Sequence, residues 1–146
     1  LVEVIKLLIF CLKNKQIKWY MPILSILIGM FAVFPATFIQ LLFPEMFFAK
    51  QTLLTLLFSS LVYIALVEEV CKTVCLFLVP NKNLSITSFF ALSFLVGYSF
   101  GSFENIIYIF KGMTNPILRM LTSCVIHSVC TGTAAFFVWF LSWLVL

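Results

Sequence analysis

The residues of this sequence that could carry out chemistry are three glutamates, one lysine and the only histidine. They are Glu68, Glu69, Lys72, Glu104 and His127. Hydrolysis of a peptide bond needs a base that activates water, a group that stabilises the oxyanion and an acid for the leaving amine. Carboxylates and an imidazole can supply all three functions where a fold brings them together. The residue types therefore predict a functional site, and hydrolysis is one chemistry that they allow.

These residues lie in a very apolar chain. Of its 146 residues, 64% are hydrophobic and 10% are charged, whereas about a quarter of a typical soluble domain is charged. The mean hydropathy is +1.21. This composition excludes a soluble globular domain, a disordered chain and a disulfide-stapled secreted module. The net charge of +4 forms no basic stripe, so a nucleic acid is not expected as a partner.

Four apolar runs are long enough to cross a bilayer, whose hydrocarbon core of about 30 Å needs about 20 helical residues. Short segments rich in helix breakers separate the runs, so neighbouring helices should be antiparallel. We expect an all-α polytopic transmembrane helical bundle that forms a single domain over residues 1–146, with a short apolar segment before the first full span. The expected spans are residues 20–43, 51–79, 86–110 and 116–146.

The second span contains an acidic pair beside a lysine. A charge at the bilayer centre costs roughly 2.5–3.5 kcal/mol, so these residues disfavour insertion. Lys72 follows Glu68 by four residues and Glu69 by three, so it can bond either carboxylate on one helix face. Such residues are expected to be kept for a function rather than for stability.

The third span carries a stripe of small residues that leads to its only carboxylate. Ser93, Gly97 and Gly101 recur at four-residue steps, and Glu104 follows on the same broad face. Small residues at this spacing let a neighbouring helix approach closely. The stripe therefore predicts that Glu104 faces the bundle interior.

The fourth span has a polar ridge formed by Ser123, His127 and Thr131, again at four-residue steps. Depth is the difficulty for a shared site. At 1.5 Å per residue from the outer helix ends, Glu104 lies roughly 9 Å deep, His127 roughly 16 Å and Glu68 roughly 25 Å. Straight parallel helices would not align these residues, so we expect the second helix to tilt strongly or to begin outside the membrane.

The same residues carry a family resemblance over the second to fourth spans. The motifs are Glu68-Glu69-x-x-Lys72, Phe100-x-x-x-Glu104-Asn105, and His127 followed five residues later by Gly132. This order resembles the PrsW family of the glutamic intramembrane protease clan. The clan also contains the CAAX prenyl endopeptidases and the anterior-pharynx-defective subunit of gamma-secretase. The resemblance implies a membrane-embedded peptidase that cuts membrane-anchored substrates, such as anti-sigma factors.

The resemblance also implies roles for individual residues. Glu68 matches the motif glutamate that activates water, Glu69 is its neighbour, and His127 matches the histidine of the last motif. Glu104 stands where CAAX-type relatives have a histidine, and Thr131 stands where they have Asn or Asp. The expected catalytic residues are thus Glu68, Glu69, Glu104 and His127. The expected supporting residues are Lys72, Asn105 and Thr131.

Three other hydrolytic chemistries are alternatives to a glutamate-activated water, for which no cofactor is expected. A zinc site formed by Glu69, Glu104 and His127 has a workable number of ligands, but the sequence has no H-E-x-x-H motif. A cysteine nucleophile at Cys124 or Cys130 would lie three residues from His127, but apolar burial makes a thiol a poor nucleophile. A serine mechanism lacks a G-x-S-x-G motif.

Functions without catalysis also remain open. The buried acids and the lysine could form a proton or cation relay in a transporter, as intramembrane acids often do. The chain could instead be a non-catalytic scaffold that binds partner helices through its polar cluster. Cleavage that is lost in Glu68→Gln would favour the peptidase, and ion flux without cleavage would favour the transporter.

The distribution of lysines predicts the orientation in the membrane. Lys13, Lys15 and Lys18 precede the first full span, which places that loop in the cytoplasm together with Lys82. Lys50, Lys111 and Arg119 are then on the outer side. The composition suggests a bacterial plasma membrane, with the lipid bilayer and a membrane-anchored protein or peptide substrate as partners. The oligomeric state is not predicted, and the five scattered cysteines are not expected to form disulfides.

Overall fold

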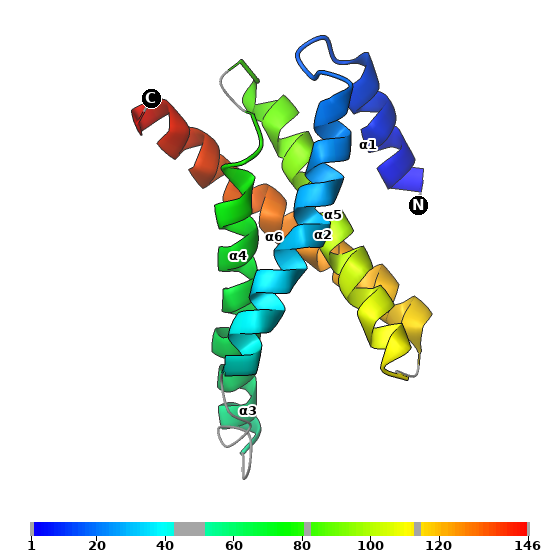
Figure 1. The fold of residues 1–146 in the computed structure, drawn as a ribbon, viewed down its shortest axis with the longest axis vertical. Helices are drawn as coiled ribbons and strands as arrows, with labels where there is room; N and C mark the ends of the chain where they lie inside the picture. The colour runs from blue at the N-terminus through cyan, green and yellow to red at the C-terminus, as the bar shows by residue number, and fades with distance from the viewer. Residues whose placement is uncertain (1, 43–51, 81–82, 113–114, 146) are drawn as a thin grey trace.

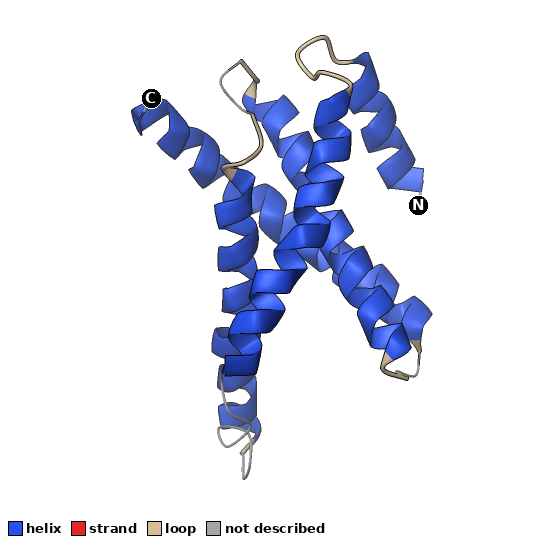
Figure 2. Cartoon of the chain, in the orientation of Figure 1, coloured by secondary structure: helices blue, strands red, loops and turns tan. Residues whose placement is uncertain are grey.

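The computed structural model describes residues 2–42, 52–80, 83–112 and 115–145, and nearly all of them are helical (Figure 2). No strand occurs in these four stretches. The elements in chain order are α1 (Val2–Lys13), α2 (Tyr20–Leu42), α3 (Leu53–Ser59), the π-helix η2 (Ser60–Leu66), α4 (Val67–Leu76), α5 (Ile86–Phe110) and α6 (Pro116–Val145).

Four helices are long and apolar enough to cross a membrane. They cover Tyr20–Leu42, Leu53–Leu76, Ile86–Phe110 and Ile117–Ser142. The predicted all-α fold with four spans and a short N-terminal segment, here α1, is thereby confirmed. The second span ends at Leu76 rather than at residue 79. The backbone N–H groups of residues 77–79 donate to carbonyls three residues earlier rather than four, so the α-helical pattern has ended there. Pro80 follows and cannot continue a helix.

The second span is continuous but not uniform, since it consists of α3, η2 and α4. The Thr52 side chain caps α3 by accepting a hydrogen bond from the Thr55 backbone N–H (3.4 Å). No residue of η2 is buried. A π-helical stretch changes the helical phase, and such stretches often occur at functional sites. The part of the span that precedes η2, which is α3, has little contact with the other helices, whereas α4 turns Glu68 and Lys72 inward.

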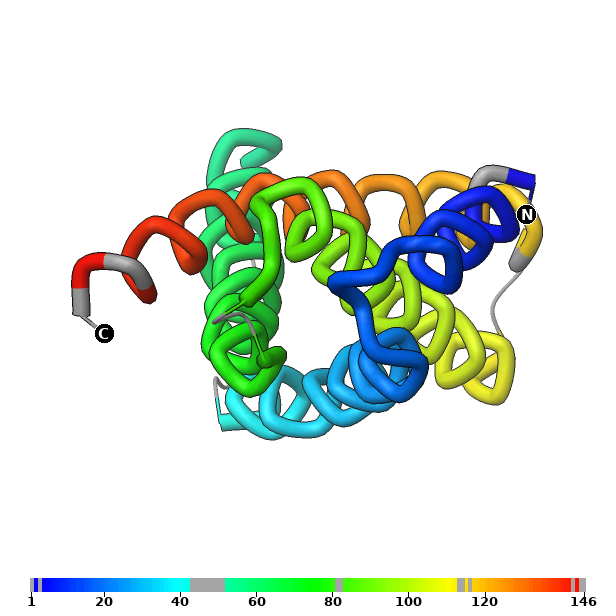
Figure 3. The backbone as a smooth tube through the Cα atoms, turned by 90° about the horizontal axis from the view of Figure 1, so that it is seen from above, coloured from blue at the N-terminus to red at the C-terminus, as the bar shows by residue number. Residues whose placement is uncertain are grey.

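The helices cross one another rather than run parallel (Figure 1). The most extensive packing of α5 is with α6 and α2, while α4 packs against α2 and α6. Seen from above, α2 and α6 lie on opposite sides of the bundle, with α4 and α5 between them (Figure 3). In α5, 61% of the most apolar window is buried, against 11% in the second span. The centre of the fold is therefore α5.

The glycines of α5 permit its close contact with α6. A Cβ on Gly97 would overlap the backbone of His127, and a Cβ on Gly101 would lie 2.9 Å from the His127 ring. Ser93, one turn earlier, is fully buried. The predicted stripe of small residues thus packs against the helix that carries the histidine.

Hydrogen bonds join the α1–α2 loop to the beginning of α5. Gln16 Oε1 accepts from the backbone N–H of Ser85 (3.1 Å) and from the Ser88 hydroxyl (3.0 Å). The Asn14 amide donates to the Ser88 hydroxyl (2.8 Å). The loop that contains Lys15 therefore lies at the same end of the bundle as the α4–α5 connection. Lys50 and Lys82 lie outside the described residues.

Candidate active site

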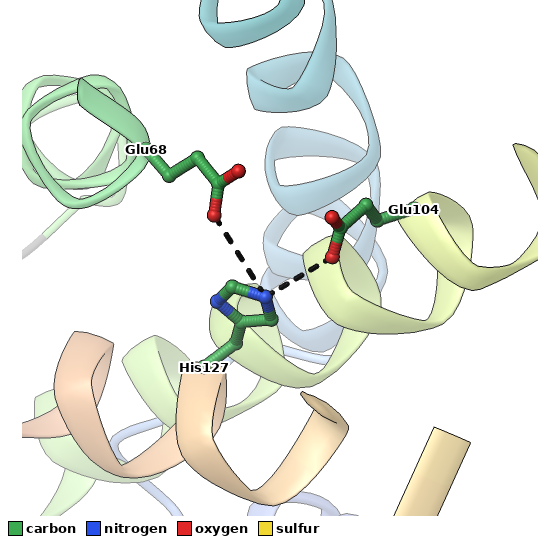
Figure 4. A group of neighbouring side chains, drawn as sticks. All are labelled: Glu68, Glu104 and His127. Atoms are coloured by element: carbon green, nitrogen blue, oxygen red, sulfur yellow. Dashed lines mark hydrogen bonds and ion pairs between the residues drawn. The ribbon is translucent and has the colours of Figure 1, made fainter. Parts of the chain in front are cut away.

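Three polar side chains from three helices converge in the middle of the bundle (Figure 4). Glu68 extends from α4, Glu104 from α5 and His127 from α6, and they point toward one another. His127 Nε2 lies 3.2 Å from Glu104 Oε2 and 4.0 Å from Glu68 Oε2. One oxygen of each carboxylate and a ring nitrogen all lie within 4.8 Å of one another.

Helix crossing removes the difference in depth that straight helices would impose. His127 lies against Gly97 and Gly101, so α6 crosses α5 at the turn just before Glu104. Within the second span, α4 is the part that packs against both α6 and α5. Glu68 reaches the other two side chains because the helices cross one another (Figure 1).

Glu68 is buried, with 7% of its surface exposed. Its Oε1 accepts a hydrogen bond from the Gln40 side-chain amide of α2 (3.0 Å). Its Oε2 faces His127, and no hydrogen bond to this oxygen occurs within the described stretches. One oxygen of Glu68 is thus held by a neutral donor while the other is available at the centre of the cluster.

Glu104 is held by more partners than Glu68. Arg119 Nη2 donates to its Oε1 (3.0 Å), and the Ser123 hydroxyl donates to its Oε2 (3.4 Å). The guanidinium of Arg119 also stacks on the ring of Tyr108, 3.7 Å from the centroid. Its Nε donates to Asn105 Oδ1 (3.1 Å). The charge of Glu104 is therefore balanced by a guanidinium that is itself fixed in place.

Lys72 is fully buried beside the histidine. Its Nζ bonds Glu69 Oε1 (2.5 Å) and His127 Nδ1 (2.8 Å). It also lies 4.5 Å from the centroid of the Phe100 ring, and that ring meets the His127 ring edge-on at 5.0 Å. The lysine therefore pairs with Glu69, although its sequence spacing allowed either carboxylate.

The remaining predicted residues lie around this cluster. Glu69 Oε1 is 3.8 Å from His127 Nδ1, on the side of the ring away from Glu104. Asn105 is engaged by Arg119 and by the Cys124 thiol, so it supports Arg119 rather than facing the other acids. Thr131 is fully buried, and its hydroxyl has no hydrogen-bond partner among the described residues.

The cluster matches a metal site in spacing but not in hydrogen bonding. The three donors are Glu68, Glu104 and His127, with Glu68 in place of the expected Glu69, which is drawn to Lys72. A histidine that binds a metal normally donates its other N–H to an acceptor. Here the other nitrogen, Nδ1, faces an ammonium group, which has no acceptor to offer.

Cysteine and serine are poorly placed to act as nucleophiles. Both nitrogens of His127 are engaged, by Lys72 and by Glu104. Cys124 is buried near Ser102 and Asn105, Cys130 is exposed, and all five cysteines are free thiols. Ser128 donates to a backbone carbonyl of its own helix. Neither Cys124 nor Ser128 is therefore placed to give its proton to the His127 imidazole.

Three contributors to the cluster were not predicted from the sequence as site residues. Gln40 is the single amide side chain of α2, and Phe100 appeared only as a motif position. Arg119 was assigned only to the outer end of its span. A search for cations and amides near span ends would have found Gln40 and Arg119, because such residues are rare in apolar helices.

Comparison with known proteins adds a family assignment. The family model described as PrsW family intramembrane metalloprotease matches residues 18–144. No curated protein and no solved structure matches the chain. The matched range contains α2 to α6 except for the last residue of α6, and hence every residue of the cluster.

Proposed function

This chain belongs to the PrsW family of intramembrane proteases, and from that premise we propose that it hydrolyses peptide bonds of membrane-anchored proteins with a water activated by Glu68. The observation that supports this proposal is the convergence of Glu68, Glu104 and His127 from three helices. Two acids and an imidazole, one of them buried and two partly buried, are gathered at one point of an apolar bundle, where they disfavour folding, which a catalytic role would explain.

Glu68 acts as the general base. Its Oε2 lies 4.0 Å from His127 Nε2, which is too long for a direct hydrogen bond and suits one water molecule between them. Glu68 takes a proton from this water as the oxygen attacks the scissile carbonyl carbon. Gln40 holds the carboxylate so that Oε2 points at the water.

His127 and Glu104 complete the reaction. In the free protein the Nε2–H of His127 bonds Glu104 Oε2, which orients the ring. This N–H changes its partner from Glu104 to the oxyanion as the negative charge forms on the carbonyl oxygen. Glu68 then passes its proton to the amide nitrogen as the C–N bond breaks. The products are one new carboxyl terminus and one new amino terminus, and Glu68 returns to its starting form.

The family description implies a metal ion, for which Glu68, Glu104 and His127 have a suitable spacing. Such an ion would polarise the carbonyl or activate water when bound. The hydrogen bonding of His127 does not suit a ligand, since Nδ1 faces the Lys72 ammonium. Every step is therefore assigned to the protein's own residues.

The proposed substrates are single-span membrane proteins, with anti-sigma factors as the family-based example. We place the chain in a bacterial plasma membrane with the α1–α2 loop in the cytoplasm. Lys13, Lys15 and Lys18 near this loop support that orientation. A substrate helix would have to reach the cluster laterally, from within the bilayer.

The test is cleavage by purified protein reconstituted in lipid with a panel of single-span substrates. We expect cleavage by the wild type, none by Glu68→Gln and wild-type cleavage by Glu3→Gln. Glu3 is the matched control because it is a carboxylate of α1, outside the spans. Equal cleavage by Glu68→Gln would refute the proposal, and ion flux without cleavage would favour a transporter.

A further inference from the structure

Lys72 is the one fully buried charged residue among the described residues, and it touches the histidine rather than the centre of the cluster. Burying an ammonium costs several kcal/mol unless its donors are satisfied. Three groups satisfy it: the Glu69 carboxylate, the face of Phe100 and His127 Nδ1. The carboxylate and the negative face of the aromatic ring both attract an ammonium group.

This arrangement decides which nitrogen of His127 carries the proton. An ammonium has three N–H donors and no acceptor, so Nδ1 must accept. A neutral imidazole that accepts at Nδ1 carries its proton at Nε2. Nε2 then donates to Glu104 Oε2, 3.2 Å away, which agrees with a carboxylate that can only accept.

We propose that Lys72 is a positioning residue that fixes His127 in the tautomer protonated at Nε2, so that His127 can donate to the reacting carbonyl oxygen and cannot bind a metal ion through Nε2. The chemical consequence rests on the proposed protease function. The tautomer itself follows from the contacts of Lys72 alone.

Two consequences follow for the cluster. The donor at Nε2 is present before the substrate arrives, so stabilisation of the oxyanion requires no proton transfer to the ring. A metal ion would have to remove the Nε2 proton and would leave Nδ1 opposite a positive charge. The ammonium thus discriminates between two chemistries that the same three donor residues could support.

The test uses the fact that the chain has a single histidine. The full chain would be labelled with ¹⁵N-histidine, purified with a histidine-free tag and reconstituted in lipid for NMR. We expect Nδ1 to give the signal of an unprotonated acceptor and Nε2 the signal of a protonated nitrogen. A proton on Nδ1, an imidazolium or a mixture of tautomers would overturn the proposal.

Lys72→Met tests the cause of the tautomer. This variant is expected to lose the single-tautomer spectrum, whereas Lys15→Met, on the exposed loop, should keep it. An unchanged spectrum in a folded Lys72→Met protein would overturn the role of the lysine. If that variant does not fold, zinc added to the wild type decides. We expect both nitrogen signals to stay unchanged, and loss of the Nε2 proton would contradict the proposal.

These measurements do not require activity, so the two proposals can fail separately. An inactive preparation with the expected tautomer would refute the protease function alone. An active preparation with the other tautomer would refute the role of Lys72 alone.

Discussion

Gly97 of α5 lies so close to His127 of α6 that a Cβ on the glycine would overlap the histidine backbone. The contact fixes the height and rotation of the His127 imidazole relative to Glu104, which is two turns further along α5. The stripe of small residues on α5 and the polar ridge on α6 therefore pack against each other.

Gly97→Ala should therefore damage both stability and activity. The added methyl group must push α6 away, and overpacking of this kind costs about 1–3 kcal/mol. Thermal unfolding in detergent and the cleavage rate would be measured together, and we expect the rate to fall at least about 10-fold. Gly132→Ala is the control, because the three atoms nearest to its added Cβ all belong to the side chain of Phe90 and none to a helix backbone. A Gly97→Ala protein with wild-type stability and rate would contradict this contact.

The hydrogen bond from Gln40 to Glu68 predicts a second effect. Gln40→Leu removes the neutral donor that bonds Glu68 Oε1 and orients the proposed base. A hydrogen bond to a charged group contributes about 1.5–3 kcal/mol, so we expect kcat to fall about 10- to 100-fold. Thr37→Val, one turn earlier in α2, serves as the control. Equal rates for the two variants would show that Glu68 needs no such support.

Arg119 should matter for the charge of Glu104. Arg119→Gln removes the cation that bonds Glu104 Oε1, and the arginine is partly exposed, so its contribution is reduced by solvent. We expect about a 10-fold loss of kcat, which corresponds to about 1.4 kcal/mol. Lys111→Gln removes a cation at the same end of the bundle without touching Glu104 and should have little effect. A double-mutant cycle with Glu104→Gln should show coupling, and strict additivity would argue against the pair.

Much of this arrangement could be predicted from residue types and spacing. Apolar runs define the four spans because a bilayer requires satisfied backbone hydrogen bonds over a known length. The spacing of Gly97 and Gly101 also predicted that Glu104 would face inward. The single domain over residues 1–146 and the catalytic roles of Glu68, Glu69, Glu104 and His127 stay predictions.

Other features depend on contacts that one sequence does not reveal. No pattern of residues in the sequence predicts the π-helix η2. This segment changes the helical phase and so determines on which face of the span Glu68 lies. Lys72 pairs with Glu69 rather than with Glu68 because of where His127 and Phe100 lie in the fold. Glu104 pairs with Arg119 because the packing of α6 against α5 brings the guanidinium next to the carboxylate. These are tertiary effects, and local spacing leaves them open.

Metal removal tests the chemistry assigned to the cluster. Because His127 is expected to carry its proton at Nε2, exhaustive chelation should leave the cleavage rate within about 2-fold of its starting value, less than about 0.5 kcal/mol. Added zinc should not stimulate the rate. Loss of activity on chelation, followed by recovery with one equivalent of zinc, would contradict the metal-free account.

The most direct measurement of the central claim is mass spectrometry of the products released from a single-span substrate by reconstituted protein. We expect a new terminus within the membrane segment of the substrate, because Glu68, Glu104 and His127 meet inside the helical bundle. We also expect that folded Glu68→Gln protein releases no such product. The same product at the same rate from Glu68→Gln would contradict the claim.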